Sequence, residues 1–264
     1  MKYVKAIAPP LVLFGISLTY TLLYTFQSPY LIGADTHLEY WSFIQTIIDG
    51  RWQADSVSRV TNSCLSLTYL PYWIWKITGW NALMIYKVLY PVIASFIPVV
   101  TYYISRRYAG IWPSMLAGVM IILSMFNVWA ASYARNVTSL LFMVIAIWIA
   151  TGNIKQKGIY VTLMVLAVVV SYYAAGLIII MLLIGQYIIG KVVNIKPWLP
   201  YGGLFAVIIM VTWWYGWKNP LALDVFRSAN VFYNIHIPDK LGIITVIVLA
   251  YLSSSPCLAE GSST

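Results

Sequence analysis

Long, continuous runs of apolar residues dominate the chain and predict its elements. The runs are unbroken and do not alternate between apolar and polar positions, which is typical of helices and not of barrel strands. A helix needs about 20 apolar residues to cross the hydrocarbon core of a bilayer. The runs occupy residues 6–26, 82–104, 111–130, 137–151, 158–171, 174–190, 199–217 and 241–252. We therefore expect an all-α polytopic membrane protein with about eight transmembrane helices, in which the short runs 137–151 and 158–171 are tilted or broken.

The segment 27–81 lies between the first two runs and carries a helical pattern of its own. Apolar residues recur at the spacing of one helix face, at Leu38, Trp41, Ile44 and Ile48. Gly50 then follows as a helix stop. A second stretch, Leu65 to Ile77, is apolar and aromatic but too short to cross a bilayer. We expect a large first outer loop with two helices along the membrane interface, their Trp and Tyr side chains at headgroup level.

Composition supports a membrane protein and argues against a soluble domain or a nucleic-acid-binding protein. Hydrophobic residues make up 61% of the 264 residues and charged residues 9%, with a mean hydropathy of +0.82, whereas soluble domains carry about 25% charged residues. The net charge of +9 does not indicate a nucleic-acid partner, because Lys and Arg stand singly or in pairs at the ends of apolar runs. The two cysteines, Cys64 and Cys257, fit no metal or redox spacing.

The charged residues between the runs predict one orientation. A cytoplasmic N-terminus leaves purely basic inner segments, as the positive-inside rule requires. These segments carry Lys2, Lys5, Arg106, Arg107, Lys155, Lys157, Lys191 and Lys196. The acidic residues that then fall outside are Asp35, Glu39, Asp49, Asp55, Asp224 and Asp239. We expect an integral protein of a prokaryotic plasma membrane, with an uncleaved first helix, one transmembrane domain over 1–252 and a polar tail, 253–264, that is a truncated or altered end.

An acidic cluster just after the first apolar run is the strongest candidate for chemistry. Asp35 follows Gly33-Ala34 at the start of the helical pattern, so we expect Asp35 to be the helix N-cap. Glu39 stands one turn later on the same helix face, and His37 lies off that face. In a catalytic interpretation Asp35 is a general base and Glu39 binds or orients substrate. In a structural interpretation the two acids only stabilise the start of a surface helix.

Five short motifs follow one another in an order that is known from one enzyme superfamily. They are Gly33–Tyr40, Asp49–Trp52, Leu70–Trp73, Thr78–Asn81 and Tyr102–Arg107. This order resembles the N-terminal part of GT-C type glycosyltransferases, multi-spanning enzymes that use polyprenyl-phosphate-linked sugars. The resemblance covers roughly residues 1–190. In the order of these motifs the chain is similar to protein O-mannosyltransferases, aminoarabinose transferases and poorly characterised archaeal membrane proteins.

The chain departs from this superfamily in two acidic positions, and these departures weaken the case for a metal site. The family's frequent adjacent Asp-Glu is spread here as Asp35 and Glu39, and the second outer loop, 131–136, lacks the acid that metal-dependent oligosaccharyltransferases place there. His37 is either a solvated interfacial residue or part of a metal site, and no second acidic or histidine cluster nearby would complete such a site. A divalent metal is therefore not favoured, and no cofactor is assigned.

The resemblance implies a donor site around the second outer loop. Arg135 of this loop would hold the donor phosphate in a bidentate fork, as the arginine of the O-mannosyltransferases is expected to do. Tyr133 in the same loop and His37 would contact substrate. Tyr172 and Tyr173, at a bend between two short runs, would line a sugar or lipid pocket. The plainer alternatives are a snorkelling arginine and an interfacial aromatic belt.

The leading hypothesis is a membrane glycosyltransferase that moves a sugar from a polyprenyl-phosphate donor to a protein, glycan or lipid acceptor on the outer face. Two alternatives stay open. A transporter or flippase would need ionisable residues within the spans, where Lys87 is the clearest example. A non-catalytic membrane subunit or an inactive fragment would bind no lipid-linked sugar. Membrane lipids are expected partners in every case.

Overall fold

A computed structural model describes residues 2–53, 59–124, 133–193, 203–204 and 207–209. The regular structure in these ranges is helical, which confirms the predicted all-α class. The helices are α1 (Lys2–Phe26), α2 (Ala34–Ile48), α3 (Arg59–Asn62), α4 (Leu65–Thr78), α5 (Ala82–Ser105), α6 (Ile111–Leu123), α8 (Ala134–Ala150), α9 (Lys157–Ser171) and α10 (Tyr173–Val193). The run predicted at 241–252, the tail 253–264 and most of the run 199–217 lie outside the described residues.

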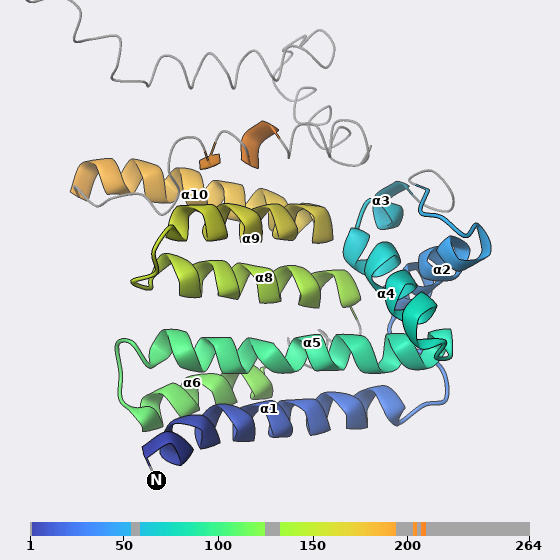
Figure 1. Cartoon of the computed structure of the whole chain (residues 1–264), viewed down its shortest axis with the longest axis horizontal. Helices are drawn as coiled ribbons and strands as arrows, with labels where there is room; N and C mark the ends of the chain where they lie inside the picture. Colours follow the sequence, from blue (N-terminus) through green and yellow to red (C-terminus); the bar gives the residue numbers. More distant parts are fainter. Residues whose placement is uncertain (1, 54–58, 125–132, 194–202, 205–206, 210–264) are drawn as a thin grey trace, which may run out of the picture.

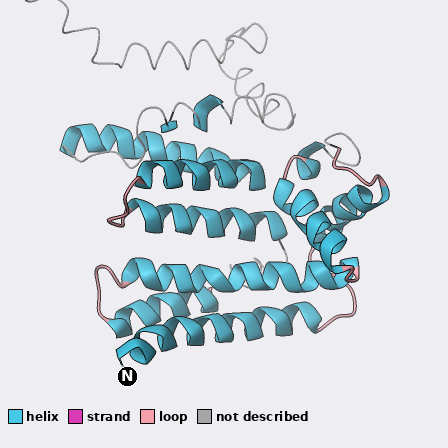
Figure 2. Ribbon diagram, viewed as in Figure 1, coloured by secondary structure: helices cyan, strands magenta, loops and turns pink. Residues whose placement is uncertain are grey.

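The long apolar helices run side by side, and the short helices form a cap at one end of them (Figure 1). α5 packs against α1, α6 and α8, and α9 and α10 continue the row beyond α8. The cap consists of α2, α3 and α4, and it lies where α1 ends and where α5 and α8 begin. Figure 2 shows the loops that lead from the row into this cap. The segment between the first two predicted spans therefore covers one end of the helix row.

Three helices in the described ranges are long and apolar enough to cross a membrane: Ile7–Phe26, Ala82–Ser105 and Tyr173–Gly190. Shorter apolar helices, α6, α8 and α9, occupy the predicted runs 111–130, 137–151 and 158–171. α6 ends sooner than predicted because Ser124 adopts an extended backbone conformation, with φ −64° and ψ 137°. The apolar helices fit a membrane-associated protein, and the finer expectation of eight spans stays a prediction.

Helix α6 packs closely against α1 and α5. Gly118 of α6 approaches α1 and α5 so closely that a Cβ there would lie 2.7 Å from Leu13 Cδ1 and 3.2 Å from the carbonyl oxygen of Pro98. Small residues let helices approach in this way in membrane bundles.

At the far end of α5 from the cap, the Arg107 guanidinium donates to the carbonyl of Trp148 and lies 5.3 Å from the ring of the same residue. This cation stands at the C-terminal end of α8, where the helix dipole favours positive charge.

Both helices predicted within segment 27–81 are present, as α2 and α4. Gly50 has a φ of 65° just after the C-cap of α2, and Gly79 caps α4 with a φ of 66°. This left-handed conformation suits glycine, because a residue with a Cβ adopts it at a steric cost. Asn81 then caps α5, since its Oδ1 accepts a hydrogen bond of 2.9 Å from the N–H of Leu83. The turn signals in the sequence therefore fall where the helices end.

The predicted apolar stripe of α2 faces away from the protein. Leu38, Trp41 and Ile48 are 46%, 49% and 66% exposed. The opposite side of the helix is largely polar yet buried, and it carries Thr36, Glu39, Ser42 and Thr46. A helix on the surface of a water-soluble domain has the reverse arrangement. α2 thus packs a polar side inward, which brings a carboxylate into the interior of the cap.

Candidate functional site

The two acids of α2 meet Arg135 at the capped end of the helix row. Asp35 and Arg135 are one hundred residues apart in sequence, and Nη2 of the arginine donates a 2.6 Å hydrogen bond to Oδ2 of the aspartate. Nε of Arg135 lies 3.1 Å from Oε1 of Glu39. Asp35 and Glu39 therefore share one face of α2, as predicted from their spacing. We call these three residues the acid–arginine cluster.

Glu39 is the most enclosed member of the cluster, with a residue exposure of 0%. Its Oε2 accepts hydrogen bonds from the backbone N–H of Ala134, at 3.1 Å, and from the hydroxyl of Tyr86, at 3.4 Å. The contact between Oε1 and Nε of Arg135 is an ion pair without hydrogen-bond geometry, so both atoms are buried without a hydrogen bond among the described residues. Buried polar atoms of this kind call for a physical explanation.

Asp35 is the accessible member, because its side chain is 50% exposed and that of Arg135 only 11%. The prediction that Asp35 is the N-cap was wrong. α2 begins at Ala34, its N-cap is Gly33 with a φ of 116°, and Asp35 lies in the first turn. An acid in the first turn is favoured by the helix dipole. The carboxylate of Asp35 is therefore available for Arg135 in place of the backbone of its own helix.

Burial sets the protonation behaviour of Glu39. Removal from water raises the pKa of this carboxyl from 4.5 to about 7, because the charged form loses hydration. Arg135, the N–H of Ala134 and the hydroxyl of Tyr86 act in the opposite direction, and the negative charge of Asp35 adds to the rise. Glu39 therefore exchanges its proton near neutral pH.

The predicted tyrosines flank Arg135 to different degrees. The Arg135 guanidinium carbon lies 5.4 Å from the ring centroid of Tyr172, within the range of a cation–π contact. Tyr173 begins α10, and its ring lies 4.9 Å from that of Tyr172. Tyr133 is the N-cap of α8, and its carbonyl accepts from the N–H of Val137 at 3.2 Å. The structure thus places Tyr172 in contact with the cluster. Tyr173 and Tyr133 are the sequence neighbours of Tyr172 and of Ala134, which contact the cluster.

His37 stands apart from the cluster. Its side chain is exposed, whereas Glu39, two residues later on α2, is buried. This difference agrees with the expectation that His37 lies off the face of the two acids. Among the described residues, no three His, Cys, Asp or Glu side chains gather closely enough to hold a metal ion.

Two tyrosines of α5 were missed as site residues. Tyr86 donates to Glu39, and Tyr90, one turn further on, donates a 2.8 Å hydrogen bond to the carbonyl of Ser66 in α4. Ser66 in turn donates to the carbonyl of Ser171 at the end of α9. These bonds fasten α4, α5 and α9 around the cluster. The available signal was a pair of tyrosines four residues apart near the start of an apolar span.

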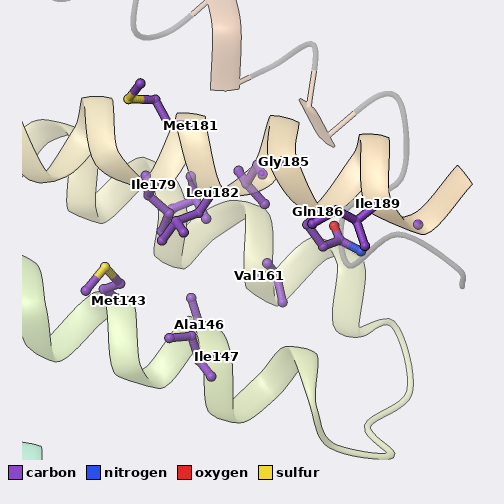
Figure 3. Close-up of a pocket in the computed structure, with 13 residues that line it drawn as sticks. Met143, Ala146, Ile147, Val161, Ile179, Met181, Leu182, Gly185, Gln186 and Ile189 are labelled. Atoms are coloured by element: carbon purple, nitrogen blue, oxygen red, sulfur yellow. The ribbon is translucent and has the colours of Figure 1, made fainter. Parts of the chain in front are cut away.

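An apolar cavity of about 600 Å³ lies elsewhere, between α8, α9 and α10 (Figure 3). Its lining on α8 starts at Met143, eight residues beyond Arg135, which is about 12 Å along a helix axis. The lining is almost entirely hydrocarbon, with Gln186 as its polar member. The cavity and the acid–arginine cluster are therefore two separate features of α8.

No protein-family model matches this chain, and no protein of curated function matches it in sequence. The geometry of the site offers one accessible carboxylate, one buried carboxylate that titrates near neutrality, and one guanidinium stacked on an aromatic ring.

Proposed function

We propose that this protein is a membrane glycosyltransferase that moves a sugar from a polyprenyl-phosphate donor to an acceptor at the outer face of the membrane. The observation that carries the proposal is that Arg135 meets Asp35, one hundred residues earlier in the chain, and Glu39 of the same helix at one end of an apolar helix row. Such transfer needs a base for the acceptor and a cation for the leaving phosphate.

Asp35 is the proposed base. Its half-exposed carboxylate is the member of the cluster that an acceptor hydroxyl can approach within hydrogen-bond distance. The acceptor oxygen forms the new bond to the anomeric carbon of the sugar while its proton passes to Asp35. The bond from the anomeric carbon to the phosphate oxygen breaks, and the leaving phosphate keeps the electron pair.

Arg135 is the proposed partner of the leaving phosphate. A guanidinium presents a planar fork of N–H donors that fits two phosphate oxygens and stabilises the charge that develops on departure. Its position beside Tyr172 also leaves an aromatic ring at the site, against which a sugar ring can pack. Glu39 is the proposed positioning residue, because it holds both Nε of Arg135 and the first N–H of α8.

Binding of a short-chain polyprenyl-phosphate sugar tests this proposal, with thermal shift in detergent as the readout. We expect the ligand to stabilise the wild type and Asp35→Asn, and to leave Arg135→Ala unshifted. Transfer to an acceptor should be lost in Asp35→Asn while binding is kept. Failure of the wild type to bind any lipid-linked sugar, or full transfer by a folded Asp35→Asn variant, would overturn the proposal.

The chain offers matched controls for both changes. Asp49→Asn removes an acid from the C-terminal end of the same helix, where the carboxylate accepts from Gln45 and not from Arg135. Arg51→Ala removes an exposed arginine just beyond α2. Both variants should bind and react like the wild type, so that a loss in either would point to general destabilisation.

A lipid flippase is the second candidate, and the apolar cavity between α8, α9 and α10 favours it. A hydrocarbon chain would fit a space lined in this way, whereas sugar transfer does not itself require such a cavity so far from Arg135. Movement of the lipid-linked sugar across a vesicle membrane without any covalent change would support this function. Sugar transfer without such movement would support the glycosyltransferase.

A further inference from the structure

The charge balance of the acid–arginine cluster limits what Arg135 can bind. With both carboxylates ionised, one guanidinium faces two negative charges, and the three side chains together carry one net negative charge. A phosphodiester that approached this cluster would meet a cation that is already neutralised. In a buried site that imbalance is felt more strongly than in water, because the effective dielectric constant is lower.

The two carboxylates respond differently when Arg135 turns to a new anion. Asp35 is half-exposed, so water can solvate its charge once the arginine contact weakens. Glu39 has no exposure, and an ionised carboxylate left there without its cation would be buried and unpaired. Buried groups in that position take up a proton and become neutral.

We propose that Arg135 binds an anionic phosphodiester only together with one proton, and that Glu39 is the residue that takes up this proton. The inference rests on the proposed function, since it concerns the donor site of that reaction. It adds that exchange of the donor at this site is coupled to a proton, and it names the carrier.

The local geometry favours Oε1 of Glu39 as the atom that takes up the proton. Oε2 of Glu39 already accepts from Ala134 and Tyr86, whereas Oε1 makes no hydrogen bond among the described residues and faces Arg135. A proton on Oε1 therefore preserves both existing hydrogen bonds. It also turns Oε1 into a donor on the side where the phosphodiester would lie.

The other groups around Glu39 do not replace it as the proton carrier. Those that act on its charge are Asp35 from α2, Cys64 before α4, Tyr86 and Tyr90 from α5, Arg135 from α8 and Tyr172 after α9. Burial raises the pKa of the Cys64 thiol to about 12, so it stays protonated throughout. Burial already brings the pKa of Glu39 to about 7 with Arg135 in place, and loss of that cation would raise it further.

Calorimetry with a short-chain polyprenyl phosphodiester of a sugar tests the inference, because the charge of a diester does not change near neutral pH. Titrations are run in two buffers of different ionisation enthalpy, above the pKa of Glu39 in the free protein. We expect the wild type to take up about one proton for each ligand bound, and its affinity to fall about tenfold per pH unit in that range. Asp35→Asn should still take up the proton, and Glu39→Gln should bind without uptake and with no pH dependence.

The outcomes separate this inference from the proposed function. Binding by the wild type without proton uptake, or with the same uptake in Glu39→Gln, overturns the inference and leaves the donor site standing. No binding by the wild type overturns both. Infrared difference spectra of the wild type serve where Glu39→Gln does not fold: ligand binding should produce the carbonyl stretch of a protonated carboxylic acid, and its absence overturns the inference.

Discussion

Arg135 and Glu39 form an ion pair that is largely shielded from water. The Nε to Oε1 distance is 3.1 Å, with exposures of 11% for the arginine side chain and 0% for that of the glutamate. Breaking a buried pair by removing one partner leaves an uncompensated charge, whereas removing both can be nearly neutral. The pair therefore makes the stability of the cap depend on both residues together.

Removal of one charge of the pair should destabilise the protein more than removal of both charges. We expect Arg135→Gln to lower the free energy of unfolding by about 3–5 kcal/mol, because it leaves Glu39 buried without its cation, so that its carboxyl either stays unpaired or must take up a proton. The double variant Arg135→Gln/Glu39→Gln should recover much of that loss. Denaturant unfolding in detergent above neutral pH, with intrinsic fluorescence as the probe, measures the four corners of this cycle.

Asp35→Asn is the matched comparison, because the Asp35 side chain is half-exposed and bonds the same arginine. An ion pair with one half-exposed partner is screened by water, so this variant should lose less stability than Arg135→Gln. Strict additivity of the Arg135 and Glu39 changes would mean that the pair carries no coupling, which contradicts the structure.

The helices of the cap could be predicted from the sequence because their signals are local. The apolar spacing of α2, the glycines at positions 50 and 79, and the cap at Asn81 each depend on neighbouring residues only. Asp35 and Glu39 were singled out from their spacing, and Arg135 through the family resemblance. The contacts of the acid–arginine cluster could not be predicted, because a spacing of one hundred residues between Asp35 and Arg135 has no local signature.

Two misjudgements have a physical origin. Asp35 was expected to cap α2, but Gly33 is the N-cap, and the aspartate in the first turn makes a tertiary contact instead. Tyr86 was overlooked because most of α5 is apolar or aromatic, so its sequence does not say which face turns towards Glu39, 47 residues earlier. In both cases the tertiary partner decides the role of the side chain.

Stability should fall as pH rises from about 4.5 to about 7, through Glu39. Its pKa is raised by burial in the folded state, so the unfolded chain loses the proton first and the folded state binds more protons across this window. The total loss is on the order of 3 kcal/mol. Above about pH 7 both states are ionised, and the contribution of Glu39 no longer changes.

The difference between wild type and Glu39→Gln isolates this contribution, since all other titrating groups are shared. We expect the difference in melting temperature, measured in detergent across the pH range, to change between about pH 4.5 and about 7 and to be constant above. Parallel curves for wild type and Glu39→Gln would show that Glu39 does not titrate differently on folding.

Gly118→Ala should loosen the contact of α6 with α1 and α5. The added Cβ would lie 2.7 Å from Leu13 Cδ1, which can move, and 3.2 Å from the carbonyl oxygen of Pro98, which belongs to the α5 backbone. Overpacking of this kind typically destabilises by about 1–3 kcal/mol. The control is Gly15→Ala in α1, where an added Cβ meets nothing within 4 Å. Thermal unfolding in detergent should separate the two variants, and equal melting temperatures would contradict the close packing at Gly118.

The outward apolar side of α2 should lie in the membrane interface. Trp41 is 49% exposed on a helix that buries polar residues, and such a side chain suits the boundary between headgroups and acyl chains. A nitroxide label at Trp41→Cys should therefore collide with dissolved oxygen more than with a water-soluble nickel complex. A label at Arg51→Cys, an exposed polar position after α2, should show the opposite preference.

The labelling background needs only Cys257→Ser. Cys64 can remain, because its thiol is buried and burial raises its pKa to about 12, which suppresses the reactive thiolate. In lipid vesicles, equal access of the nickel complex to both labelled positions would mean that α2 faces water. The apolar stripe of Leu38, Trp41 and Ile48 would then have to be covered by another protein, and the interfacial placement of the cap would be wrong.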